Sequence, residues 1–281
     1  MNTQKVLTLS CPDSPGIVHA VSGCIADSGG NIIQSQQFGD PDTQRFFMRV
    51  EFATETSSGE FRNKFSELAG TYNMDWQIDD AGRAKRTIIM VSREDHCLNE
   101  LLNRARAGEL GIEVVSVVGN HPDLAPIAQF YQVPFLNIPV TKDTKAEAEA
   151  RLLELIGSEK IELVILARYM QILSEKVCAE LTGQVINIHH SFLPSFKGAR
   201  PYAQAAARGV KLIGATAHYV TADLDEGPII EQDVVRVTHA DSAADMMRRG
   251  RDVERRVLAQ AVEWHTQHRV LLNGSRTVVF S

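Results

Sequence analysis

Several features that would direct a protein to a membrane, a secretory route or a nucleic acid are missing from this sequence of 281 residues. No apolar run approaches the length of a membrane span, and the first residues, Met1 to Lys5, lack a signal-peptide pattern. The net charge of −6 provides no basic footprint for a nucleic acid. We therefore expect a cytoplasmic protein that binds neither membranes nor nucleic acids.

Cysteine is scarce, and its spacing excludes a C-x-x-C motif. The four cysteines lie far apart, which favours reduced thiols in a cytoplasmic protein; they are Cys11, Cys24, Cys97 and Cys178. Cys97 follows a predicted strand, so a nucleophile is one interpretation. Because no activating pattern surrounds it, we interpret it as a small buried hydrophobic residue.

Residues 1–84 have the pattern of a small α/β domain. Short apolar strands are predicted near 6–9, 31–38, 46–52 and 74–78, with helices over 17–26 and 57–68. This order predicts a ferredoxin-like βαββαβ fold. A polar linker, Asp79 to Lys85, separates it from the rest of the chain.

Residues 85–281 alternate apolar strands with helices, beginning with a strand at 87–91 and a helix at 98–107. Nearly continuous apolar strands between helices predict a Rossmann-like, mostly parallel sheet that is covered on both faces. A long helix is predicted over 243–264. Its stretch Arg248 to Arg256 mixes bases with acids and resembles a solvated helix face. A hairpin turned at Asn273-Gly274 is predicted over 270–280.

The most informative stretch runs from Asn187 to Pro194, and a second follows from Asp223 to Ile230. Asn187 and His189 lie two apart on a predicted strand, so they face the same side. Asp225 lies in a turn closed by Gly227-Pro228. An amide donor, an imidazole and a carboxylate together suit attack on a carbonyl, since they stabilise an oxyanion and move protons.

Each of these residues also has a structural interpretation. Asn187 would then be a buried amide, His189 a core histidine and Asp225 a turn residue. The combination favours catalysis. His190 either assists the reaction or only replaces another residue, and the sequence does not decide between these roles. The Asn-x-His spacing is not a usual zinc pattern, so we expect no metal.

The run N-I-H-H-S-F-L-P-S-F-K-G, followed by A-H-Y-V-T-A-D-L-D-E-G-P-I-I, resembles the signature of the folate-dependent formyltransferase superfamily. With His190 after the catalytic His189, and G-V-K-L-I-G-A-T-A-H-Y-V upstream of the second run, the chain is similar to the deformylase branch. The resemblance covers nearly the whole chain and assigns the catalytic carboxylate to Asp225. One departure is Ala203, which stands where this branch often carries His.

This resemblance implies a folate pocket. The segment Ala167 to Leu173 is similar to the segment that holds the pterin in this superfamily, and the turn from Val220 to Asp225 would close over it. The residues expected to bind substrate are Met170, Gln171, Ile172, Leu173, His218 and Val220. Ile172 and Leu173 have an alternative role as ordinary core residues.

The acceptor of the formyl group is inferred from the loop Ser92 to Leu98. It contains no glycine and carries Glu94 and Asp95, which would repel a phosphate. No basic C-terminal domain follows that would bind tRNA. We therefore expect hydrolysis of 10-formyltetrahydrofolate to formate and tetrahydrofolate, with no permanently bound cofactor. The alternatives are formyl transfer to an amine and a non-catalytic folate or amino-acid sensor.

The N-terminal domain carries a second resemblance. The turn Pro12 to Gly16, together with G-G-N-I from Gly29, is similar to an ACT regulatory domain. Such a domain would pair with its copy in another subunit, giving a homo-oligomer. It would bind a small amino acid, glycine or methionine, through Asp13, Gly16 and Asn31. The alternative is that the glycines only form turns and the domain only dimerises.

Overall fold

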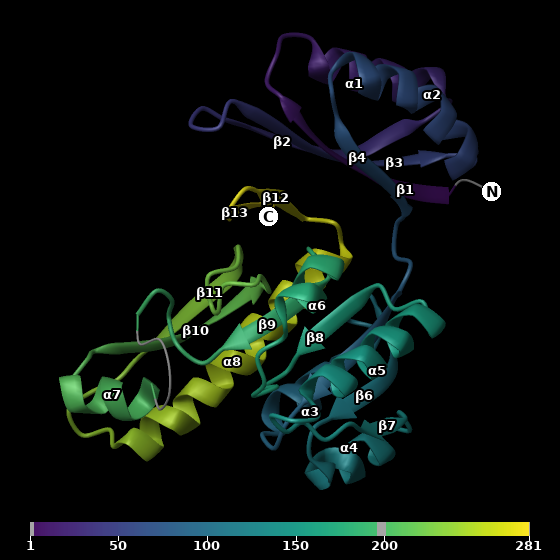
Figure 1. Ribbon diagram of the computed structural model, residues 1–281. Helices are drawn as coiled ribbons and strands as arrows, with labels where there is room; N and C mark the ends of the chain where they lie inside the picture. The colour runs from purple at the N-terminus through teal and green to yellow at the C-terminus, as the bar shows by residue number, and fades with distance from the viewer. Residues whose placement is uncertain (1–2, 196–200, 281) are drawn as a thin grey trace. The chain divides into compact units, whose positions relative to one another are not determined.

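The computed structural model of the protein describes residues 3–195 and 201–280. The chain forms two compact units (Figure 1). The N-terminal unit contains the residues up to Arg83 together with 267–273 and 277–281, and the larger unit contains 84–266 and 274–276. Within the described ranges, no helix is both long and apolar enough to cross a membrane.

The N-terminal unit is a four-stranded antiparallel sheet with the strand order β2-β3-β1-β4. The order of its elements along the chain confirms the predicted βαββαβ arrangement. These elements are β1 (Thr3–Pro12), α1 (Ile17–Asp27), β2 (Asn31–Asp40), β3 (Arg45–Thr54), α2 (Ser58–Thr71) and β4 (Asp75–Asp80).

Helices α1 and α2 cover one face of this sheet (Figure 1). Successive residues of a strand point to opposite faces. Met48, Val50 and Phe52 of β3 therefore join the core beneath the helices, while Phe47 belongs to a separate cluster. In α2, Phe61 and Phe65 are fully buried one turn apart and stack on each other. Both rings thus belong to the core between the sheet and the helices.

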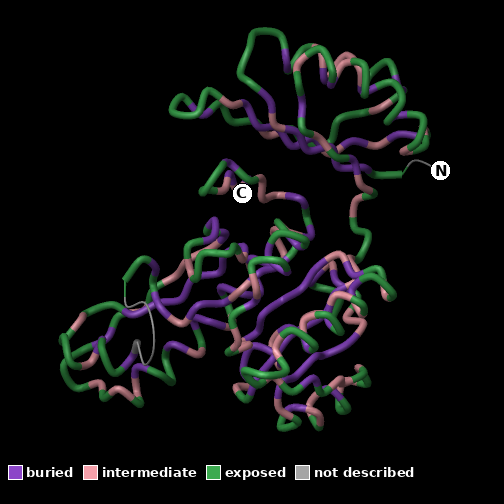
Figure 2. The backbone as a smooth tube through the Cα atoms, in the orientation of Figure 1, coloured by how far each residue is buried: buried purple, intermediate pink, exposed green. Residues whose placement is uncertain are grey.

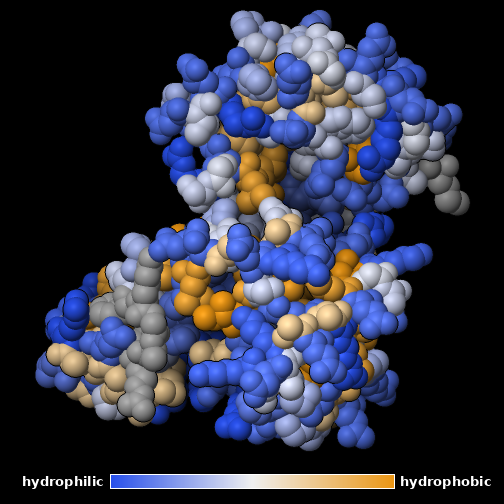
Figure 3. Space-filling model, in the orientation of Figure 1, coloured by the Kyte–Doolittle hydropathy of each residue, from blue (hydrophilic) through white to orange (hydrophobic). Residues whose placement is uncertain are grey.

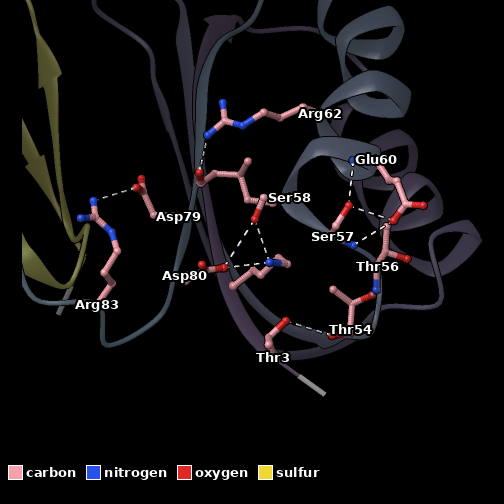
Figure 4. A network of polar contacts seen from close by, with 12 residues as sticks. Thr3, Thr54, Thr56, Ser57, Ser58, Glu60, Arg62, Asp79, Asp80 and Arg83 are labelled. Atoms are coloured by element: carbon pink, nitrogen blue, oxygen red, sulfur yellow. Dashed lines mark hydrogen bonds and ion pairs between the residues drawn. The ribbon is translucent and has the colours of Figure 1, made fainter. Parts of the chain in front are cut away.

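The start of α2 is fixed by polar contacts (Figure 4). Ser57 accepts a hydrogen bond from the backbone N–H of Glu60, and the Glu60 carboxylate accepts one from the backbone N–H of Ser57. Such a capping residue contributes about 1 kcal/mol. Lys5 of β1 lies 2.8 Å from both Ser58 Oγ and Asp80 Oδ1, so the helix start is joined to β1 and β4.

Most of the C-terminal hairpin groups with the N-terminal unit and only 274–276 with the larger unit, whereas the sequence assigned the whole hairpin to the second domain. It consists of β12 (Val270–Asn273) and β13 (Arg276–Val279). Val278 and Phe280 pack with Phe47, which points away from the helices, and Asn273 donates a 2.6 Å hydrogen bond to Asp40. The physical reason is that Phe47 leaves an apolar site on the open face of the sheet, and the tail covers it.

The larger unit is built on a seven-stranded sheet with the order β11-β10-β9-β8-β5-β6-β7. The five strands from β9 to β7 are parallel, and β10 and β11 are antiparallel additions, so the predicted mostly parallel sheet is confirmed. Its elements are β5 (Lys85–Val91), α3 (His96–Arg106), β6 (Ile112–Gly119), η1 (Pro122–Leu124), α4 (Ala125–Phe130), β7 (Phe135–Asn137), α5 (Lys145–Ser158), β8 (Leu163–Leu166), α6 (Glu175–Glu180), β9 (Val185–His189), α7 (Pro201–Arg208), β10 (Leu212–Tyr219), β11 (Ile229–Arg236) and α8 (Ala243–Thr266).

Burial explains which elements the sequence revealed. All four residues of β8 are buried, in keeping with its continuous apolar run, and the middle strands of the sheet are largely buried (Figure 2). Strand β11 was not expected, because it lies at the sheet edge and carries the polar residues Glu231, Gln232 and Asp233. In α8, the stretch expected to be a solvated face includes Glu254, which is only 1% exposed.

Candidate active site

Asn187 and His189 lie at the carboxyl end of β9, and both face the same side as expected. Strand β10 runs antiparallel to β9 and pairs His218 with Asn187 and Thr216 with His189. This register brings the Nε2 atom of His218 to 3.2 Å from the amide nitrogen of Asn187. The strand pairing therefore positions three polar side chains at one end of the sheet.

Asp225 reaches this group from the turn before β11. Its φ of 57° is left-handed, a conformation that aspartate tolerates better than most residues. The turn is fixed by Gly227, where an added Cβ would lie 1.7 Å from the backbone oxygen of Tyr219. As a result, Asp225 Oδ1 lies 3.2 Å from Nδ1 of His189 and 3.8 Å from Nε2 of His218.

Hydrogen bonding fixes the tautomers of the two histidines. The Nδ1–H of His218 donates to the backbone oxygen of Tyr219 at 2.9 Å, because a carbonyl only accepts. Its Nε2 is then an acceptor for the amide of Asn187. The Nδ1 of His189 faces the Asp225 carboxylate, and within the described ranges its Nε2 is buried without a hydrogen-bond partner. This Nε2 atom is the one left for substrate chemistry.

The charges of the group follow from burial and pairing. Partial burial alone would raise the pKa of Asp225, but the hydrogen bond and charge of His189 outweigh it and hold this pKa below its ordinary value. Burial lowers the pKa of His218, which keeps its ring neutral. At neutral pH the site therefore combines a carboxylate, a neutral His218 and an amide held by that histidine.

A cavity of about 370 Å³ adjoins these residues. Every predicted catalytic and substrate-binding residue lines it: Asn187, His189 and Asp225, with Met170, Gln171, Ile172, Leu173, His218 and Val220. Met170 and Ile172 are each 56% exposed and Leu224 is 57% exposed, so apolar side chains are open to a ligand. On the face seen in Figure 3, apolar side chains interrupt the otherwise hydrophilic surface of this unit. The cavity suits a flat, largely apolar ligand with a few polar groups.

Two further residues of the cavity wall, Arg168 and His190, were not predicted as site residues. Arg168 follows β8 with a left-handed φ of 64°, and its guanidinium donates to Nδ1 of His190. The His190 ring stacks on that of His189, with centroids 5.2 Å apart. Arg168 also forms an ion pair with the buried Glu254 at 3.4 Å. The sequence signal that could have identified Arg168 is its charge directly after the apolar run of β8.

Glu254 is the centre of a buried polar cluster behind the cavity wall. Its carboxylate accepts from the Tyr202 hydroxyl at 2.6 Å and contacts Nε2 of His96 at 2.9 Å. Together with Cys97, His96 and Glu254 form a group with the spacing of metal ligands. Arg168 already neutralises Glu254, and burial raises the pKa of the Cys97 thiol well above its ordinary value. These features favour a hydrogen-bonded cluster, and a protonated Cys97 is a poor nucleophile.

The loop after β5 takes part in these contacts. Ser92 accepts a hydrogen bond from the backbone N–H of Met170, and Glu94 forms an ion pair with Arg251 of α8. Ser92 and Glu94 are thus directed to the protein itself, whereas Arg93 and Asp95 are exposed. Ala203 is an exposed residue of α7 and does not line the cavity. The end of the first motif, residues 196–198, lies outside the described residues.

The predicted effector residues lie in the N-terminal unit. Gly16 has a φ of 92° and directly precedes α1, as a turn glycine should. Asp13, Gly16 and Asn31 are all exposed. Because they are exposed, these residues are accessible to a ligand. Effector binding stays a prediction.

Comparison with known proteins agrees with this geometry. A family model described as formyl transferase matches residues 85–262, and one described as ACT domain matches residues 5–64. A formyltetrahydrofolate deformylase of a Corynebacterium species is 52% identical over 279 residues, covering 98% of each chain. The crystal structure of a formyltetrahydrofolate deformylase from Pseudomonas syringae has a TM-score of 0.96 and 47% identity, covering 100% of this chain and 95% of that chain.

The fold and the site thus define a folate-utilising protein of the formyl transferase class with an N-terminal ACT domain, as the resemblance implied. The chain belongs to the formyltetrahydrofolate deformylase family. A more distant structure, glycinamide ribonucleotide transformylase 1 from Symbiobacterium toebii, has a TM-score of 0.67 and 28% identity, covering 72% of this chain and 97% of that chain.

Proposed function

We propose that this protein hydrolyses 10-formyltetrahydrofolate to formate and tetrahydrofolate. The observation that carries the proposal is the pairing of Asp225 with His189 beside Asn187 on the wall of an apolar cavity. The names of the relatives support the substrate, and the cavity supports its chemistry, because a pterin is flat and has amide-like edges. 10-Formyltetrahydrofolate is the substrate, and the chemistry needs no permanently bound cofactor.

The reaction begins when water attacks the formyl carbon and gives a proton to Nε2 of His189, the ring nitrogen that is left without a partner among the described residues. Asn187 and His189 hold the formyl oxygen as it becomes an oxyanion, a contribution typically worth about 3 kcal/mol per donor. Asp225 accepts a hydrogen bond from Nδ1 of His189 and stabilises the charge that this ring takes up. Nε2 of His189 then passes this proton to N10, the bond between the formyl carbon and N10 breaks as the oxyanion collapses, and formic acid leaves and loses its proton to solvent as formate.

The folate itself is held by the two segments that line the cavity. One of them is the stretch Met170 to Leu173, where the pterin would bind. The other is the turn from Val220 to Asp225. His218 acts on the substrate through Asn187, whose amide it orients.

The choice of water over an amine acceptor rests on the loop after β5. Ligands of parallel sheets bind at the carboxyl ends of the strands, so this loop is where a phosphorylated second substrate would be expected. Its Glu94 is paired with Arg251, and His96 with Glu254. The loop supplies acids and internal contacts rather than a phosphate cradle. An intact triad likewise argues against a non-catalytic sensor.

The ACT domain suggests control by an amino acid. We propose glycine or methionine as the effector, bound at Asp13, Gly16 and Asn31 where the domain pairs with its copy in a second subunit. Exposure of all three residues and the free N–H groups at the start of α1 support this site. The protein would then be a cytoplasmic homo-oligomer, a location that its four free cysteines also fit.

The test is an assay of formate release from 10-formyltetrahydrofolate by the purified full-length chain, with and without glycinamide ribonucleotide. We expect formate and tetrahydrofolate in equal amounts, and no change when the amine is present. Transfer of labelled formyl to the amine at the rate of hydrolysis would establish a transferase. Absence of both products, with folate binding retained, would establish a sensor.

A further inference from the structure

The buried polar cluster around Glu254, behind the cavity wall, has no role in the reaction described above. Glu254 is a carboxylate with 1% exposure, and it lies on α8, an element that contributes nothing to the cavity lining. It holds three groups from three other parts of the chain: Tyr202, His96 and Arg168. Burying an ion costs several kcal/mol unless it is paired and hydrogen-bonded. The free-energy cost of burying the Glu254 carboxylate is therefore a reason to look for a function of this cluster.

The cluster is also sterically arranged for Tyr202. Gly250 lies one turn before Glu254 on α8, and an added Cβ there would lie 2.0 Å from the Tyr202 hydroxyl oxygen. The absence of a side chain at Gly250 lets the Tyr202 ring lie against α8 and reach Glu254. Burial raises the pKa of Tyr202, with the charge of Glu254 adding to it, so the phenol keeps its proton and acts as donor.

Arg168 connects the cluster to His190, which stacks on His189. Arg168 is left-handed at φ 64°, a conformation that costs free energy in residues other than glycine. Its guanidinium joins Glu254 to Nδ1 of His190. Because a guanidinium only donates, this Nδ1 has no proton, and the neutral His190 ring carries its proton on Nε2.

We propose that Glu254 and Arg168 are positioning residues for the hydrolysis, and that they fix His190 as a neutral imidazole stacked against His189. The inference rests on the proposed function. Stacking holds the His189 ring with Nδ1 on Asp225 and Nε2 toward the formyl oxygen. Neutrality matters because His189 takes up positive charge as the oxyanion forms, and a cation in the adjacent ring would oppose this.

The charges around His190 agree with this assignment. Burial, followed by the positive charge of Arg168, lowers the pKa of His190 to about 4. The groups that face it are Arg168 after β8, Glu254 on α8, His189 on β9, Asp225 in the turn before β11, and the Tyr202 ring on α7. The two carboxylates act in the opposite direction and are outweighed.

The first test compares Glu254→Gln with Glu263→Gln. Glu263 is a matched control on the same helix, where it pairs with Arg104 outside the cluster. In the full-length enzyme, Glu254→Gln should lower kcat roughly 10- to 100-fold with KM within about 3-fold, as expected for misplacement of a catalytic group. Glu263→Gln should stay within about 2-fold of the parent. A Glu254→Gln protein with the parent kcat overturns the proposal.

The second test is a readout that a merely structural role would not move. In Arg168→Met, loss of the neighbouring cation raises the pKa of His190 toward its ordinary value of about 6.5. The kcat/KM profile should then fall between pH 7 and 5 more steeply than in the parent. Adding His190→Asn should remove this extra fall, because the titrating ring is gone. An unchanged profile in Arg168→Met overturns the proposal.

Two measurements keep the proposal testable if a single variant does not fold. The double variant Glu254→Gln/Arg168→Met removes both buried charges, and it should fold and turn over as slowly as Glu254→Gln. Nitrogen-15 NMR of the histidines in the unmodified protein should show His190 neutral, with its proton on Nε2, from pH 5.5 to 8. A proton on Nδ1 overturns the proposal. Absence of formate release by the unmodified enzyme would instead overturn the proposed function.

Discussion

Asn187 on β9 and His218 on β10 face each other across an antiparallel strand pair, and the amide nitrogen of Asn187 lies 3.2 Å from Nε2 of His218. Since Nδ1–H of His218 is already donated to the backbone oxygen of Tyr219, the ring has one lone pair left, and it accepts from Asn187. The amide that is proposed to hold the formyl oxygen is therefore oriented by a histidine whose pKa is lowered by burial, which favours the neutral ring.

This relationship predicts the outcome of two substitutions at His218. In His218→Phe the amide of Asn187 loses its acceptor and its fixed orientation, so kcat should fall roughly 10-fold or more. In His218→Gln an amide oxygen takes the place of Nε2, and much of the rate should be kept. Steady-state kinetics of the two variants check this. Equal rates for Phe and Gln would contradict an orienting hydrogen bond.

Replacement of the carboxylate tests the reacting group. Asp225→Asn removes the negative charge that faces Nδ1 of His189 and should lower kcat roughly 1000-fold, within the range of general acid–base catalysis. The affinity for folate, measured by isothermal titration calorimetry with tetrahydrofolate, should change only a few-fold because the cavity walls remain. Normal turnover in a folded Asp225→Asn protein would remove Asp225 from the mechanism.

The turn that carries Asp225 depends on Gly227. Gly227→Ala would place a Cβ 1.7 Å from the backbone oxygen of Tyr219, which no side-chain rotation relieves. We expect a loss of about 2 kcal/mol or more in the free energy of unfolding, together with lost activity. Gly157→Ala in α5 is the matched control, because its Cβ would meet nothing within 4 Å. That variant should be neutral or gain about 0.5–1 kcal/mol. Similar melting temperatures for both variants would contradict the account.

Stability should fall in mild acid because of His190. Its pKa is about 4 in the folded protein, against about 6.5 when unfolded. The unfolded chain therefore binds the proton first as the pH falls below about 6.5, and up to about 3 kcal/mol of stability is lost by pH 4. Urea unfolding at pH 7 and pH 5 measures this loss. It should be smaller in His190→Asn, and equal losses would argue against a neutral, partly buried ring.

Effector binding is best measured on the whole chain. Titration calorimetry with glycine and with methionine should show binding of one of them, and Asp13→Ala or Asn31→Ala should weaken it without changing turnover in the absence of amino acid. Binding alters the rate only if it favours one arrangement of the linked domains. If neither amino acid binds or changes the rate, the domain serves assembly alone.

The sequence predicted those parts of the site that depend on short-range geometry. Two residues apart on a strand must share a face, so Asn187 and His189 were paired correctly, and a turn before Gly227-Pro228 returned Asp225 to them. The resemblance assigned folate binding to the segment after β8, and each residue predicted there lines the cavity. The order of elements along the chain and the mostly parallel sheet of the second domain followed from apolar runs, and the middle strands of that sheet are largely buried (Figure 2).

The remaining features depend on contacts between distant parts of the chain. His96 and Glu254 are 158 residues apart in sequence, and nothing near Glu254 distinguishes it from the exposed acids around it. Its burial arises only when α8 packs against the strands and Tyr202 fits at Gly250. The placement of the C-terminal hairpin is of the same kind, because Phe47 and Phe280 are joined only by the fold.

That hairpin makes the N-terminal unit discontinuous in sequence. Its sheet is translated before the larger unit, whereas Val278 and Phe280, which cover Phe47, are translated after it. During synthesis, Phe47 on the open face of this sheet therefore stays uncovered until Phe280 has left the ribosome. A fragment that ends at residue 84 lacks the two side chains that cover Phe47. The core of the N-terminal unit can therefore be completed only after the larger unit has been synthesised.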